Sequence, residues 1–249
     1  MSVATAIRLV LLTALVALVE VLCQLNVIPS TVMIAPSQMA VELARVIWSG
    51  KFTADIASTL GCVLAAVAIS VALGFLVGLL VHSMPGLRSA LEPLLASYYA
   101  VPTFIFYPVF LSIFGIGAQA IVAIAVLLAI VSMITATLNG LDRIPVVLRK
   151  TARMYRMSKI KTALIVELPA TAPYLFTGIK LSVAYSFIGV IASEFILSGS
   201  GIGYAIAYAY NNFENRQMYA LMLLIILLVT TVNTMLNRID RRLQSRRSR

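Results

Sequence analysis

Apolar residues are gathered in long blocks along this chain, and the polar segments between most of the blocks are short. Six blocks are each long enough to cross about 30 Å of hydrocarbon as a helix that rises ~1.5 Å per residue. The pattern predicts membrane spans at residues 7–25, 56–81, 92–114, 118–138, 169–197 and 218–236. We therefore expect an all-α, polytopic membrane protein with six transmembrane helices, in which residues 1–249 form a single transmembrane domain.

A cleaved signal peptide is the alternative interpretation of the first block, since Arg8 gives it a weak basic flank. The apolar region is long for such a peptide, and no convincing small-x-small cleavage site follows it promptly. We expect the block to be retained as the first span.

Prolines interrupt the third block at Pro93, Pro102 and Pro108, and aromatic residues crowd it. A proline inside a span frees a backbone carbonyl that lipid cannot satisfy, so such a helix normally lines a cavity or is covered by protein. Broken helices often mark transport pathways. A kinked helix that only packs against its neighbours is the alternative.

The connection at residues 26–55 is mixed and turn-rich, with a helix expected at residues 38–48. We expect a loop at residues 82–91 and a polar, tyrosine-rich connection at residues 204–215. In the second block, Gly74 and Gly78 are four residues apart, so a neighbouring helix can approach closely on that face.

Two charged residues fall inside the fifth block, where an ionised group is costly. Lys180 can place its amine at the interface along its flexible stem. Glu194 lies near the end of the block, just before a glycine-rich turn, where we expect it to be partly hydrated.

The segment at residues 141–169 is a polar stretch set between apolar blocks. Its apolar residues recur at steps of three and four, the spacing of an amphipathic helix: Ile144, Val147, Leu148, Ala152, Tyr155, Ile160 and Leu164. Seven cations outnumber two anions in it: Arg143, Arg149, Lys150, Arg153, Arg156, Lys159 and Lys161 against Asp142 and Glu167. We expect two short helices that present one face to another protein or to anionic lipid.

The composition of the chain is that of a membrane protein. Hydrophobic residues make up 61% and charged residues 11%, and the mean hydropathy is +1.00, which excludes an ordinary soluble domain. The net charge of +10 does not indicate a nucleic-acid partner, because the cations lie in loops and in a basic C-terminal tail at 238–249. Cys23 and Cys62 lie inside apolar blocks and His82 is the only histidine, so we expect neither a disulfide framework nor a metal site.

The distribution of cations orients the chain in the membrane. If the N-terminus is inside, the inner loops and termini hold fifteen cations: Arg8, Arg88, the seven of residues 141–169 and six of the tail. The outer loops hold three, Arg45, Lys51 and Arg216. Because cytoplasmic loops carry the excess of lysine and arginine, we expect both termini and residues 141–169 in the cytoplasm.

The chain resembles the permease subunits of binding-protein-dependent ATP-binding cassette importers. The branch it is most similar to handles nitrate, sulfonates, taurine, bicarbonate and pyrimidine precursors. In this family the loop between spans four and five carries a motif written EAA, three residues, Gly, nine residues, Ile-x-Leu-Pro. Anchoring on Leu168-Pro169 puts Val166 at the Ile position, Arg156 at the Gly position and Lys150-Thr151-Ala152 at the EAA position.

Shorter similarities follow the family's order over most of residues 29–203. They are Gly50, Val101-Pro102 through Tyr107-Pro108, Phe114-Gly115-Ile116-Gly117, Asn139-Gly140, Thr177-Gly178-Ile179-Lys180 and Ala192-Ser193-Glu194-Phe195.

The resemblance implies a type I importer permease in the bacterial inner membrane, with no enzymatic activity and no cofactor bound by this chain. The loop would form a coupling helix docked on a cytoplasmic ATPase dimer, which binds ATP and Mg²⁺. An extracytoplasmic solute-binding protein would deliver the solute. The implied coupling residues are Lys150, Thr151, Ala152, Tyr155, Arg156, Val166, Leu168 and Pro169.

Two residues depart from the family motif. Lys150 replaces the glutamate and reverses its charge, and Arg156 replaces the glycine and disfavours a left-handed backbone. Either the partner ATPase has a compensating acidic groove, or the chain pairs with an unlike permease that carries the regular motif rather than with a second copy of itself.

We expect the translocation pathway on the broken third span and the polar face of the fifth span, with a gate at the outer end of the fifth. The residues are Tyr98, Tyr99, Pro102, Phe106, Ser182, Ser186 and, at the gate, Glu194. Glu194 would hold the gate shut by accepting hydrogen bonds from the backbone of residues 199–203.

A stand-alone secondary transporter and an intramembrane enzyme are the two alternative classes. A secondary transporter of six spans would usually show ion-coupling residues and repeat symmetry, but we find only Lys180 and Glu194 and no clear repeat. An enzyme would need clustered nucleophile and base residues, and the sequence contains no G-x-S-x-G elbow, Walker loop or HExxH motif.

Overall fold

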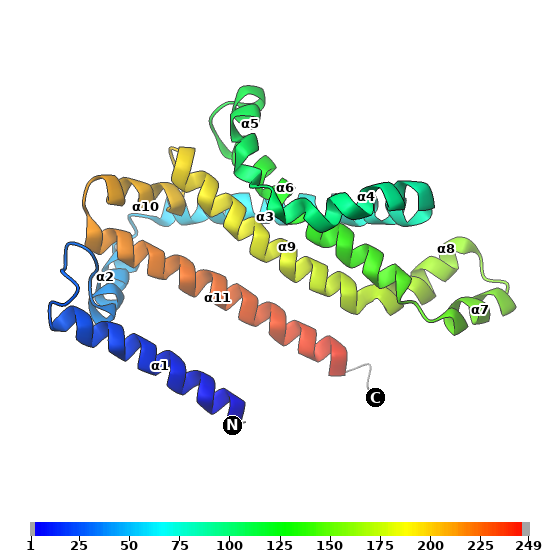
Figure 1. The fold of residues 1–249 in the computed structure, drawn as a ribbon, viewed down its shortest axis with the longest axis horizontal. Helices are drawn as coiled ribbons and strands as arrows, with labels where there is room; N and C mark the ends of the chain where they lie inside the picture. Colours follow the sequence, from blue (N-terminus) through cyan, green and yellow to red (C-terminus); the bar gives the residue numbers. More distant parts are fainter. Residues whose placement is uncertain (1–2, 246–249) are drawn as a thin grey trace. The chain divides into compact units, whose positions relative to one another are not determined.

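The computed structural model describes residues 3–245, and the regular structure in that range is helical (Figure 1). In chain order the α-helices are α1 (Val3–Gln24), α2 (Pro36–Ser49), α3 (Thr53–Ser83), α4 (Pro85–Ser97), α5 (Tyr107–Phe114), α6 (Ala118–Asp142), α7 (Val146–Met154), α8 (Lys159–Thr162), α9 (Leu168–Leu197), α10 (Ile202–Asn211) and α11 (Asn215–Ser245). The 3₁₀ turns Tyr98–Ala100 and Thr103–Phe106 join α4 to α5, and the π-helical segment Ala163–Glu167 joins α8 to α9. The predicted all-α class is confirmed.

Four of the described helical runs are long and apolar enough to cross a membrane: α3, α6, the run Lys159–Ile196 that contains most of α9, and Asn215–Arg241 of α11. Helices α4 and α5 pass the same test as a pair bent by 97°, which gives five spans if the pair counts as one. Helix α1 contributes the shorter apolar stretch Leu9–Gln24. The chain is therefore a multi-pass membrane protein, and the sixth span stays a prediction.

The break in the third apolar block lies at Pro102, between the two 3₁₀ turns. Pro93 lies inside α4, and Pro108 lies in the first turn of α5, where a missing N–H leaves no hydrogen bond unmade. The loop predicted at residues 82–91 is wrong, because α3 ends at Ser83 and α4 begins at Pro85. The fixed φ of proline suits the first helical position, so Pro85 starts a helix here.

The contacts divide the chain into two compact units. Unit 1 contains the residues up to Ser58 together with Glu194–Leu228. Its buried apolar cluster joins α2, α10 and the start of α11: Leu43, Val46, Phe52, Ile202, Ala205, Ile206, Ala209, Met218, Ala220 and Leu221. The predicted polar connection at residues 204–215 is therefore wrong over most of its length, because α10 places Ala205, Ile206 and Ala209 in this cluster.

Unit 2 contains Thr59–Ser193 together with the residues from Val229 onward. Glycines allow its helices to approach closely. A Cβ atom at Gly78 of α3 would lie 2.7 Å from the Thr137 Cβ of α6, and one at Gly189 of α9 would lie 2.6 Å from the Ala125 Cα of α6. Real Cβ atoms essentially never come that close, so these crossings require glycine. The close approach predicted for Gly74 and Gly78 is confirmed.

Helix α11 continues through much of the predicted basic tail, so Arg238 and Arg241 are helical. Lys180 of α9 forms an ion pair of 2.5 Å with Asp240 of α11, both in unit 2. The pairing supplies the opposite charge that an ammonium group near hydrocarbon needs. Arg246, Arg247 and Arg249 of the predicted tail lie outside the described residues.

Candidate functional site

Helix α7 and the segment after it lie beyond the adjoining ends of α6 and α9 in unit 2 (Figure 1). Of the two short helices predicted for residues 141–169, only α7 is separate, because α8 continues through the π segment into α9. In the π segment the Leu168 N–H bonds to the Ala163 carbonyl, five residues back. This wide turn lies directly before Pro169, which has no N–H to offer an ordinary helical turn.

The C-terminal end of α7 is closed by a Schellman motif. The Arg156 N–H donates to the Arg153 carbonyl at 2.9 Å, and the Met157 N–H donates to the Ala152 carbonyl at 3.0 Å. This pattern requires a left-handed residue at position 156, and Arg156 adopts it with φ +49°. Arginine disfavours this conformation, as the sequence analysis noted, but Arg156 adopts it because the two hydrogen bonds of the motif hold it there, and it does so at a steric cost that glycine would not have.

Arg149 anchors α7 to both ends of the loop. Its Nε donates to Glu167 Oε1 at 3.0 Å in the π segment, and its Nη2 donates to the Leu141 carbonyl at 3.3 Å in the last turn of α6. The Leu141 carbonyl belongs to the last four of the helix, which have no partner within it. One guanidinium therefore ties the start of α9 and the end of α6 to α7.

The apolar residues of α7 and its flanks point in two directions rather than forming one stripe. Ile144 and Ala152 are buried, and Ala152 is 2% exposed. Val147 is exposed, Met154 is 84% exposed and Tyr155 is 79% exposed. Helix α7 is thus packed on one side and presents a basic surface with large apolar side chains on the other.

The predicted coupling residues are spread over this surface and its base. Lys150, Thr151, Tyr155 and Arg156 are exposed on α7 or directly after it, while Ala152 packs inward. Val166 is half-buried in the π segment, and Leu168 and Pro169 are exposed at the start of α9. The sequence argument did not find Arg149 and Glu167 as a pair, because only the fold brings them together.

The candidate pathway residues of unit 2 meet around the two tyrosines of the 3₁₀ turn that follows α4. The Tyr98 hydroxyl donates to the Leu127 carbonyl of α6 at 2.9 Å, and the Tyr99 ring stacks on Tyr185 of α9 with centroids 4.9 Å apart. The Ser182 hydroxyl lies 3.0 Å from the Ser132 hydroxyl of α6. Tyr185 and Ser132 were missed in the sequence analysis, although Tyr185 precedes Ser186 directly.

The other pathway candidates do not share these contacts. Pro102 and the exposed Phe106 lie at the bend between α4 and α5. Ser186 is fully buried on α9, and its hydroxyl has no hydrogen-bond partner within the described part of the chain. Tyr98, Tyr99 and Ser182 are thus brought together, and Ser186 follows one helical turn after Ser182.

Glu194 lies in unit 1, where its side chain is 1% exposed, so the expectation of partial hydration is wrong. Its Oε2 accepts a hydrogen bond of 3.0 Å from the Gly203 N–H in the first turn of α10. A Cβ atom at Gly201 would collide with the Glu194 carboxylate, so glycine is required there. Asp55 of α3, which the sequence analysis did not select, accepts from the Gly201 N–H at 2.9 Å.

Two carboxylates therefore meet the N-terminal end of α10. Free N–H groups and the helix dipole both favour negative charge at this position. Of the hydrogen bonds from residues 199–203 that we predicted for Glu194, the structure shows the one from the Gly203 N–H.

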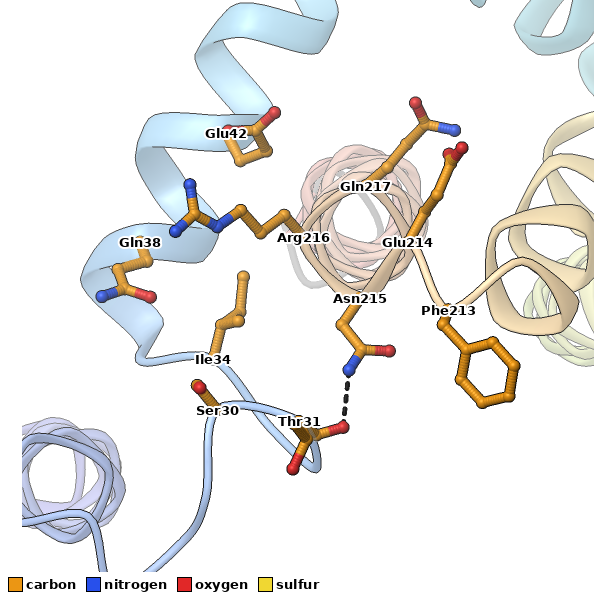
Figure 2. Close-up of a pocket in the computed structure, with 10 residues that line it drawn as sticks. All are labelled: Ser30, Thr31, Ile34, Gln38, Glu42, Phe213, Glu214, Asn215, Arg216 and Gln217. Atoms are coloured by element: carbon orange, nitrogen blue, oxygen red, sulfur yellow. Dashed lines mark hydrogen bonds between the residues drawn. The ribbon is translucent and has the colours of Figure 1, made fainter.

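A separate hollow of about 510 Å³ lies in unit 1 between α2, the preceding segment and the start of α11. Gln38 and Glu42 of α2 and Arg216 of α11 give it a polar lining. Figure 2 shows Arg216 extending toward α2 and Asn215 donating to the Thr31 carbonyl, at 2.5 Å. Among the described residues no group of three or more His, Cys, Asp and Glu side chains could hold a metal ion.

Comparison with known proteins places this chain among transport proteins. The family model described as "binding-protein-dependent transport system inner membrane component" matches residues 70–249. A nitrate import permease protein of Leptolyngbya laminosa is 33% identical over 71% of this chain and 60% of its own length. A bicarbonate transport system permease protein of Synechococcus elongatus is 33% identical over 57% of this chain and 51% of its own. The matched stretches thus span only half to 60% of these two relatives.

More distant similarities extend over more of the chain. A putative aliphatic sulfonates transport permease protein of Bacillus subtilis is 24% identical over 85% of this chain and 77% of its own length. A chain from an inward-facing structure of the MetNI methionine ABC transporter superposes with a TM-score of 0.68, at 20% identity, over 80% of this chain and 98% of that one. At this identity the structural match supports the fold.

The left-handed arginine at the end of α7 generates a prediction. Arg156→Gly should stabilise α7 by about 0.5–1 kcal/mol, because glycine adopts the required conformation without steric cost. Hydrogen exchange of the α7 amides should slow roughly two- to fivefold. Arg153→Gly, which removes the same charge inside the helix, should instead speed exchange. Faster exchange in Arg156→Gly would contradict the assignment of the Schellman motif.

Proposed function

The chain belongs to the family of binding-protein-dependent transport system inner membrane components, and we propose that it is the permease subunit of an ATP-driven importer. It forms the translocation pathway for a small solute delivered by an extracytoplasmic binding protein, and it carries out no chemistry itself. ATP hydrolysis, with its Mg²⁺, takes place in a partner ATPase dimer. A second permease, either another copy of this chain or an unlike one, completes the pathway.

The proposed topology has six spans, with both termini in the cytoplasm of a bacterium and the spans in its inner membrane. The fifteen-to-three distribution of cations supports this orientation. Helix α1 supplies the additional span, because Val3–Gln24 is 22 residues long and a span needs roughly 20. We treat residues 1–249 as one permease domain, since the family match at 70–249 includes residues of both units.

The observation that carries the proposal is the construction of α7. A short helix with exposed Met154 and Tyr155 is fixed to the ends of α6 and α9 through Arg149. A partner that moves α7 therefore moves two spans together, as rigid-body coupling requires. We propose that the ATPase binds the surface formed by Lys150, Thr151, Tyr155 and Arg156, which the buried Ala152 supports from below. Val166, Leu168 and Pro169, in the π segment and at the start of α9, are the further coupling residues of the proposal.

The proposed solute is a small anion. The three relatives described above are named as permeases for nitrate, bicarbonate and aliphatic sulfonates, and all of these solutes are anions. Tyr99, Ser182 and Ser186 would supply hydroxyl groups to the pathway, with Tyr98, Pro102 and Phe106 shaping its bent part, and hydroxyls can donate hydrogen bonds to an anion. On the outer side, the hollow at Arg216 offers the binding protein a polar recess.

We propose further that Glu194 acts at an outer gate. Its bond to the Gly203 N–H, together with that of Asp55 to the Gly201 N–H, holds the start of α10 in place. Rearranging α10 would have to break these charge-assisted bonds, which are each worth ~1.5–3 kcal/mol.

Tyr155→Asp tests the coupling surface. A carboxylate buried without a partner in an interface costs several kcal/mol, so the amount of ATPase that co-purifies with the chain should fall about tenfold or more. Tyr210→Asp is the matched control, because Tyr210 is also exposed but lies on α10. Undiminished ATPase in the Tyr155→Asp preparation would refute the docking proposal.

Glu194→Gln tests the gate. The amide keeps the shape and one acceptor oxygen but loses the charge, so the closed state should weaken by about tenfold in population. In the reconstituted complex, ATPase activity without binding protein should rise, and stimulation by binding protein should shrink. A lowered melting temperature with unchanged stimulation would show instead that Glu194 only anchors the end of α9.

A further inference from the structure

An apolar groove in unit 2 lies where the spans meet the basic loop. It has a volume of about 240 Å³ and is lined by side chains of α3, α6, the π segment and α9, among them Phe75, Leu79, Leu141, Leu164 and Leu175. Glu167 is the only charged residue of its lining. The lining residues belong to helices long and apolar enough to cross a membrane, so lipid is the solvent next to this groove.

A cation stands at the edge of the groove. Arg149 bonds to Glu167 and to the Leu141 carbonyl, and both of these residues line the groove. The guanidinium group has five N–H donors, and within the described part of the chain it makes these two hydrogen bonds. The guanidinium therefore neutralises Glu167, and its remaining N–H donors are available to a ligand.

Two further cations lie close in sequence to, or contact a neighbour of, residues that line the groove. Lys161 is exposed two residues before Ala163, a lining residue of the π segment. The Arg143 guanidinium lies 5.6 Å from the ring centre of Tyr174, the neighbour of the lining residue Leu175. Of these cations, Arg149 is the one that bonds directly to residues of the groove.

The setting of the groove decides what fills it. Its lining is mostly apolar, its Glu167 carboxylate is paired with Arg149, and helices long and apolar enough to cross a membrane border it. Hydrocarbon from the surrounding lipid can therefore reach the groove, and burial of an acyl chain against these side chains is favourable.

We propose that this groove binds an anionic phospholipid, with part of an acyl chain between α3, α6 and α9 and the phosphate on Arg149. An acyl chain matches the apolar lining, and a guanidinium is the side chain best suited to bind a phosphate through paired N–H donors. Basic pockets between transmembrane helices bind lipid head groups in this manner. The bound lipid would contact both the π segment and the anchor of α7, so it would stiffen the connection between α7 and α9.

Native mass spectrometry of the full chain, purified in detergent, tests the proposal with phosphatidylglycerol and phosphatidylcholine of identical acyl chains. Both lipids carry the phosphate, but the choline cation of phosphatidylcholine cancels its charge and is repelled by the neighbouring cations. Wild-type chain should therefore retain phosphatidylglycerol about tenfold more strongly than phosphatidylcholine. This comparison needs no variant, so it does not depend on the folding of one. Equal retention of the two lipids would overturn the proposal.

Two variants then place the lipid. Arg149→Gln should lose the preference for phosphatidylglycerol, and Ala163→Trp, which puts a ring into the groove, should weaken both lipids about tenfold or more. Arg153→Gln removes the same charge from α7 and should bind both lipids as wild type does. Loss of the preference in Arg153→Gln to the same extent as in Arg149→Gln would show a diffuse charge effect, and unchanged binding by Ala163→Trp would show that the chain lies elsewhere. Either result would overturn the assignment of the groove.

Discussion

Satisfaction of the backbone hydrogen bonds is the constraint on which the rest of this structure depends. Hydrocarbon offers no partner to an N–H or C=O group, so each crossing segment must be helical and each irregularity must be compensated. Two irregularities of the described helices stand next to candidate residues, the bend at Pro102 between α4 and α5 and the π segment before Pro169. Both adjoin residues that we assign to transport or coupling. A segment that departs from the regular helix can change its direction, which suits it to such a role.

Much of the fold follows from the length of the apolar blocks. The predicted spans at 56–81, 118–138 and 169–197 match α3, α6 and α9 to within a few residues, apart from the last four of α6. Helix α10 was missed because its tyrosines were interpreted as polar loop residues. The sequence does carry the signal, since Ile202, Ala205, Ile206 and Ala209 recur at helical spacing and are all buried.

The sequence predicted only that part of the candidate site whose residues lie in one continuous segment. Residues 141–169 could be recognised from their charge, their spacing and their motif. The Arg149 anchor could not, because Glu167 is eighteen residues away and nothing local distinguishes Arg149 from the other cations. Asp55 and Tyr185 were missed for the same reason, because each contacts a residue that is far away in the sequence and comes close only in the folded chain. For Arg156 the fold overrode a local preference: the Schellman motif keeps it left-handed.

Photo-crosslinking from α7 in living cells tests the central claim, that a cytoplasmic ATPase drives this permease through α7. A benzoylphenylalanine in place of Met154, which is exposed at the end of α7, should form a covalent adduct with a protein that contains a Walker loop. The same probe in place of Trp48, exposed on α2, should not form it. Adducts of the Met154 probe with lipid alone, or with a protein that has no nucleotide-binding motif, would contradict the account.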